Sequence, residues 1–90
     1  MSAPTAPATA ETIRRNLGEF LAGRTKQTVA DDVDLFGTGL VTSLFAMELL
    51  VHLEQSFAVT IAGPDLTLDN FRTVDAMTAL VLRLKGGTGV

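Results

Sequence analysis

The chain has 90 residues, 47% of them hydrophobic, which suffices for one folded domain and is too little for two separate cores. It has no cysteine and a single histidine, so composition excludes disulfides and thiolate metal sites and disfavours a small hydrolase, which needs a base beside its nucleophile. The net charge of −3 and the lack of a basic stripe disfavour nucleic-acid binding.

The two ends of the chain show no apolar periodicity. Segment 1–8 is rich in Ala, Pro and Thr, and segment 86–90 is rich in Gly, so both are predicted to be flexible tails around one domain over residues 9–85. Neither a signal peptide nor a membrane-spanning stretch is visible, so we expect a cytoplasmic monomer without membrane contact.

The first predicted helix covers about residues 10–22. Thr9 is the expected N-cap, Gly23 is the expected stop, and Glu11 and Arg15 have the i, i+4 spacing of an ion pair. The apolar stripe of this helix consists of Ile13, Leu17, Phe20 and Leu21.

A long connection follows, over about residues 24–41. Loops of this length are uncommon in a compact domain, and we expect Leu35 and Phe36 to hold it against the core. Its acidic residues lack the spacing of a calcium loop and are interpreted as solvated, without a metal site. They are Asp31, Asp32 and Asp34.

The second predicted helix covers about residues 43–57 and has two faces. Its expected core face consists of Ala46, Leu49, Leu50, Leu53 and Phe57. The opposite stripe consists of Leu44, Glu48, Val51 and Gln55. Exposed apolar residues beside an acid are typical of a transient partner surface, with ordinary surface residues as the alternative. Met47 is interpreted as core filling, and His52 as a surface partner of Glu48.

The last third of the chain contains a short helical turn near residues 68–71 and a final helix over about residues 74–84. Thr73 is the expected N-cap of the final helix, and Asp75 lies in its first turn. Its apolar face consists of Val74, Met77, Leu80, Val81 and Leu84. The pattern predicts an all-α fold, a small four-helix bundle of three longer helices and one short helix with a long first loop.

Ser43 lies where the long loop becomes the second helix. A hydroxyl there is near the positive end of the helix dipole, which suits an anionic phosphodiester. The alternative is structural, because Ser and Thr are common N-caps and either Thr42 or Ser43 could serve only as that cap.

A wider pattern surrounds this serine. Leu35-Phe36, Gly39, Ser43-Leu44, Leu49-Leu50, Leu53-Glu54 and Phe57 stand in the order of a carrier-protein attachment segment, and Phe71-Arg72-Thr73-Val74 follows downstream. Over about residues 10–84 the chain therefore resembles the acyl and peptidyl carrier proteins. This resemblance implies a four-helix bundle in which a phosphopantetheinyl transferase attaches 4′-phosphopantetheine from coenzyme A to Ser43.

The resemblance also implies that the protein is not an enzyme. Acyl groups would be held as thioesters on the arm, while acyl-loading and acyl-modifying enzymes, an acyltransferase or a synthase among them, perform the chemistry. The docking surface carried over from the family consists of Leu44, Glu48, Val51, Glu54 and Gln55. In it Glu48 and Glu54 would meet basic partner residues.

The sequence departs from the family at Thr42, where the usual residue is Asp, which puts in doubt which transferase recognises the domain. The sequence of residues 39–47 is similar to that of discrete carriers that build unusual polyketide extender units, such as methoxymalonyl, in antibiotic pathways. The alternatives are a peptidyl or aminoacyl carrier of a nonribosomal pathway and an unmodified helical interaction domain.

Overall fold

The computed structural model describes residues 9–86, and every regular element in them is helical. The helices are α1 (Ala10–Thr25), α2 (Ser43–Phe57), α3 (Leu68–Phe71) and α4 (Val74–Gly86), with one 3₁₀ turn at Gly63–Asp65. This confirms the predicted all-α bundle of three longer helices and one short one. The segments 1–8 and 87–90 that were predicted as tails lie outside the described residues, whereas Gly86 ends α4.

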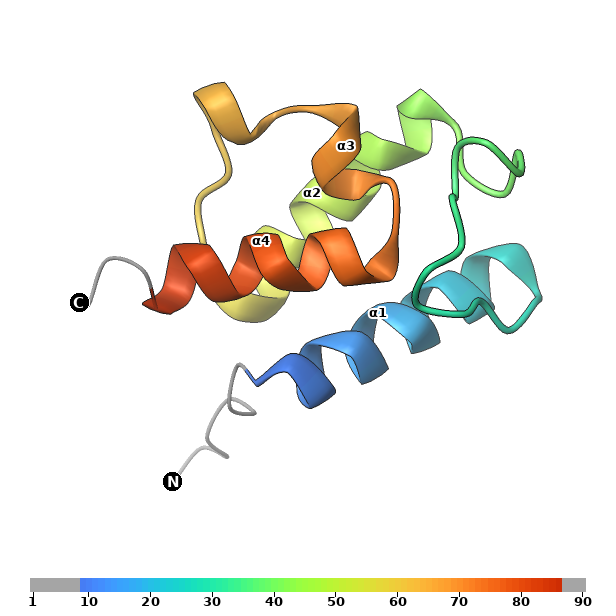
Figure 1. The fold of residues 1–90 in the computed structure, drawn as a ribbon, viewed down its shortest axis with the longest axis horizontal. Helices are drawn as coiled ribbons and strands as arrows, with labels where there is room; N and C mark the ends of the chain where they lie inside the picture. Colours follow the sequence, from blue (N-terminus) through green and yellow to red (C-terminus); the bar gives the residue numbers. More distant parts are fainter. Residues whose placement is uncertain (1–8, 87–90) are drawn as a thin grey trace.

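The helices surround one core (Figure 1). In that view α4 crosses in front of α2, α1 runs along the lower side of α4, and α3 packs on both α2 and α4. The long loop, which covers residues 26–42, joins the end of α1 to the start of α2. None of the helices in residues 9–86 is long and apolar enough to cross a membrane.

The ends of α1 show where local reasoning holds and where it fails. Thr9 caps the helix as predicted, because its hydroxyl accepts the Thr12 N–H at 3.2 Å. The predicted stop at Gly23 is wrong, since α1 continues to Thr25. The end is set instead by Lys26, which adopts a left-handed conformation (φ 62°) and donates its N–H to the Ala22 carbonyl at 2.8 Å.

The start of α4 was predicted correctly. The Thr73 hydroxyl accepts the Ala76 N–H at 2.9 Å, which makes this residue an N-cap. Asp75 in the first turn has a second role, because its carboxylate lies 3.0 Å from the Arg14 guanidinium of α1. An ion pair therefore links the start of α4 to α1.

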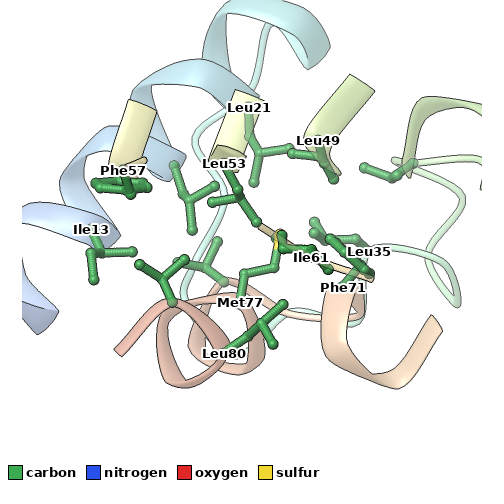
Figure 2. Packing of buried hydrophobic residues seen from close by; sticks show 14 of the residues in the cluster. Ile13, Leu21, Leu35, Leu49, Leu53, Phe57, Ile61, Phe71, Met77 and Leu80 are labelled. Carbon is green, nitrogen blue, oxygen red and sulfur yellow. The ribbon is translucent and has the colours of Figure 1, made fainter. Parts of the chain in front are cut away.

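The core is formed by residues from all four helices and from both long connections. Figure 2 shows side chains of α1, α2 and α4 pointing toward one another, with the Met77 sulfur near the centre. The residues with no exposed surface are Ile13, Leu17, Leu21, Leu35, Leu49, Leu53, Val74, Met77 and Val81. Two predicted core residues, Leu50 and Leu84, are only half-buried. Met47 was placed in the core wrongly, because 59% of its surface is exposed.

The long loop is held to the rest of the chain by both apolar and polar contacts. Leu35 is fully buried, and its N–H donates to the Arg72 carbonyl at 2.8 Å. The acids of this loop were interpreted as solvated, but two of them are engaged. Asp31 lies 3.7 Å from the Arg14 guanidinium, and Asp34 lies 3.3 Å from that of Arg72. Within residues 9–86 no group of three or more acids and histidines could hold a metal ion.

Candidate functional site

The start of α2 separates the roles of its two hydroxyl residues. Thr42 is the N-cap, because its side-chain oxygen accepts the Phe45 N–H at 3.1 Å and its carbonyl accepts the Ala46 N–H at 3.0 Å. Ser43 is the first residue of the helix and is exposed. The capping function that either residue could have had is therefore performed by Thr42, which leaves the Ser43 hydroxyl available for another role.

The Ser43 hydroxyl has the surroundings that an anionic modification needs. It makes no hydrogen bond to any residue in the described part of the chain. The first turn of α2 contains no acidic residue, and the N–H groups at a helix start have no partner within the helix. A phosphate ester at this oxygen would lie at the positive end of the helix dipole without a repelling carboxylate in that turn.

The turn that leads into α2 is fixed by Asp34. Its carboxylate accepts the Gly37 N–H at 2.8 Å, and this hydrogen bond, with the charge of Arg72, holds the pKa of Asp34 below its ordinary value. A side chain at Gly37 would bring its Cβ within 2.6 Å of the Asp34 carboxylate oxygen. Gly39 adopts a φ of 79°, which favours glycine. These local features direct the loop so that α2 begins at the surface.

An apolar hollow of about 170 Å³ begins at Ser43 and lies between α2 and the segment that leads into α3. Phe71 is almost fully buried within its lining, while Leu66 and Leu68 are about half exposed. The residues that line it are Ser43, Ala46, Met47, Leu50, Leu66, Thr67, Leu68 and Phe71. A group attached to the Ser43 oxygen could therefore contact apolar surface directly beside its attachment point.

The predicted docking stripe lies on one face of α2 and is exposed. Leu44, Glu48, Val51 and Gln55 are all exposed to solvent. Met47 belongs to the same surface, which the assignment of this residue to the core had overlooked. We call the surface formed by these five residues the outer face of α2.

Glu54 differs from the other predicted docking residues. It is half-buried, and its carboxylate accepts the Ile61 N–H at 2.8 Å across the turn that follows α2. This hydrogen bond fixes the extended segment after the helix. The structure therefore gives Glu54 a backbone hydrogen bond within the fold.

A cluster between α1 and α2 was missed by sequence reasoning. His52 was expected to pair with Glu48, but its ring stacks on Phe20 at 4.0 Å and its Nε2 lies 2.6 Å from the Asn16 side-chain oxygen. Partial burial, together with the charge of Arg24, lowers the pKa of His52. The α1 residues of this cluster stand at i, i+4 and i+8, a periodicity that could have indicated a second contact face of α1.

Arg24 connects this cluster to the outer face of α2. Its guanidinium lies over the rings of Phe20, at 5.1 Å, and Phe45, at 5.5 Å, and these two rings stack at 5.9 Å. The same guanidinium forms an ion pair with Glu48. Glu48 is thus paired with a cation of α1 rather than with His52 of its own helix.

The chain matches a known protein family. A family described as "Phosphopantetheine attachment site" matches residues 11–81, which is most of the chain and includes every element that positions Ser43. No curated protein matches closely enough to add an individual relative. An exposed serine hydroxyl at a helix start, without a hydrogen bond in residues 9–86 and with apolar surface beside it, fits the covalent group that this family carries.

Proposed function

The chain belongs to the phosphopantetheine attachment-site family, and from this premise we propose that it is an acyl carrier protein with its arm on Ser43. Members of this family attach a 4′-phosphopantetheine group covalently, and such carrier domains work with phosphopantetheinyl transferases and acyl-handling enzymes. The observation that supports Ser43 as the attachment point is its exposed hydroxyl at the first residue of α2, next to a separate capping residue.

Attachment requires a nucleophilic oxygen that a transferase can reach. The Ser43 oxygen forms a new phosphodiester with the phosphopantetheine part of coenzyme A, the bond to the nucleotide phosphate breaks, and the hydroxyl proton leaves to a base of the transferase. Thr42 keeps the helix start in place, because its cap does not depend on the Ser43 side chain. The N-terminus of α2 stabilises the anionic product.

The attached arm supplies the thiol that the chain lacks. The sequence contains no cysteine, so a thioester can be held only on the arm. We assign to the protein a carrier role without catalysis of its own, in which transferases, acyltransferases and synthases perform the reactions. The similarity of residues 39–47 to extender-unit carriers favours polyketide biosynthesis in the cytoplasm, with a peptidyl carrier as the alternative.

Mass spectrometry tests the attachment directly. The full chain is incubated with coenzyme A and a transferase of broad specificity, and we expect one phosphopantetheinyl adduct per chain. Ser43→Ala should remove the adduct, while the control Ser56→Ala, which changes another serine of α2, should keep it. A wild-type chain that never gains the adduct would refute the carrier function, and an adduct on Ser43→Ala would refute the site.

A further inference from the structure

The exposed apolar side chains of the described chain concentrate on the outer face of α2. Leu44 is 80% exposed, Met47 is 59% exposed and Val51 is 47% exposed. Together they account for three of the five large hydrophobic residues that residues 9–86 expose. Apolar surface gathered in this way on one helix face is typical of a partner site.

The two carboxylates of α2 are both engaged within the fold. Glu48 is paired with Arg24 of α1, and Glu54 accepts the Ile61 N–H at 2.8 Å. The sequence of α2 contains no other acid. Glu48, the acid on the outer face of α2, is therefore already paired with a cation, and a basic patch on a partner would gain little from it.

The pairing of Glu48 is held in place by packing. The guanidinium of Arg24 lies over two stacked rings, Phe20 of α1 and Phe45 of α2, and cation–π contacts restrain a side chain that would otherwise be mobile. The His52 ring also stacks on Phe20 and extends the cluster along the two helices. The charge of Glu48 is consequently compensated by a positioned cation.

An open hollow of about 430 Å³ lies between α1 and this face of α2. Its lining combines apolar side chains with the paired charges and consists of Phe20, Arg24, Met47, Glu48, Val51, His52 and Gln55. One positive and one negative side chain are present, so the lining has no net charge when His52 is neutral. The complement of such a surface is an uncharged apolar projection.

We propose that the enzymes that dock on α2 insert an uncharged apolar projection into the hollow between α1 and α2, with Arg24 cancelling the charge of Glu48. This inference rests on the proposed carrier function and specifies the chemistry of its partners. It replaces the acidic docking role assigned to Glu48 and Glu54 by an apolar one centred on Met47 and Val51.

Rates of phosphopantetheinyl transfer measure this docking. With coenzyme A and one transferase of broad specificity, kcat/KM for the wild-type chain should change less than about twofold between about 0.05 and about 0.5 M NaCl. Met47→Gln and Val51→Thr keep the size of each side chain but make it polar, and each should lower kcat/KM about tenfold. Glu48→Gln leaves the charge of Arg24 uncompensated, so transfer to this variant should become dependent on salt by at least about threefold over the same range.

Removing the neutralising cation gives a reciprocal test. Arg24→Gln leaves Glu48 unpaired, so transfer should become dependent on salt by at least about threefold over the same range. The double variant Arg24→Gln/Glu48→Gln should return to the flat response of the wild type. Arg15→Gln, which removes the same charge from the opposite side of α1, is the matched control and should leave the response flat. Melting curves identify any variant that has lost its fold.

The outcomes separate this inference from the function on which it rests. Absence of an adduct on the wild-type chain refutes the carrier function and the inference together. An adduct on Ser43 combined with a steep salt dependence of the wild type refutes only the inference, and so does an adduct combined with a flat salt response of Glu48→Gln. Unchanged rates in both Met47→Gln and Val51→Thr also refute it, because the transferase would then dock on another surface of the chain.

Discussion

The inner and outer faces of α2 carry apolar side chains of similar size in opposite surroundings. Leu49 and Leu53 on the inner face have no exposed surface, whereas Leu44 and Met47 on the outer face are more than half exposed. An apolar side chain removed from water contributes to folding, and one that stays in water contributes only when a partner covers it. One helix therefore stabilises the core with its inner face and leaves Ser43 and an apolar outer face exposed.

The largest expected difference between the two faces is in stability. Leu53→Ala should lower the free energy of unfolding by about 2 to 5 kcal/mol, because it leaves a cavity in the core. Met47→Ala should change it by less than about 0.5 kcal/mol. Urea denaturation of both variants measures the contrast. Equal losses in the two would contradict the division of α2 into two faces.

The helix start provides the next contrast. Thr42→Ala should lower the free energy of unfolding by about 1 kcal/mol, because the Phe45 N–H loses its capping oxygen. Ser43→Ala is the matched control on the adjacent residue and should have little effect on stability. Thermal denaturation compares the two, and a larger loss for Ser43→Ala would show that Ser43 is the cap.

Attachment of the arm should itself stabilise α2 by a smaller amount. The first turn contains no acid, so a phosphodiester on Ser43 should raise the free energy of unfolding by about 0.3 to 1 kcal/mol at low salt. In Thr42→Asp a carboxylate already occupies the helix start, so the gain on modification should shrink. Denaturation of the unmodified and modified forms measures both gains. A destabilised modified form would contradict the role of the dipole.

The smallest expected effect is the pH dependence of stability that His52 causes on the side of α2 that faces α1. Burial and the charge of Arg24 place its folded-state pKa below the ordinary value of 6.5. Between the folded-state pKa and about pH 6.5, the unfolded chain binds more protons than the folded chain. The free energy of unfolding should therefore fall as the pH drops through this range.

His52→Gln tests that dependence, because it removes the only histidine of the chain. Denaturation midpoints of wild type and variant are compared at about pH 7.5 and about pH 5.5. We expect the wild-type midpoint to fall more than that of the variant. A wild-type midpoint that rises on acidification, or identical changes in both chains, would contradict the assignment.

Much of the fold, and the exposed position of Ser43 at the start of α2, could be predicted from sequence. The bounds of α2, the caps at Thr9 and Thr73, and the exposure of Ser43 at the start of a helix were all predicted correctly. The end of α1 was not, because glycine is only a weak helix stop and the left-handed cap at Lys26 depends on the path of the following loop.

The helices, their caps and the serine at the start of α2 could be derived from the sequence, because they depend on periodicity and on neighbours within about one turn. The packing of the helices, by contrast, leaves Met47 exposed, pairs Glu48 with Arg24 and stacks His52 on Phe20. Each of these depends on which helix packs beside which face of α2. Contacts between side chains far apart in the sequence leave no local pattern, so they had to be read from the packed structure.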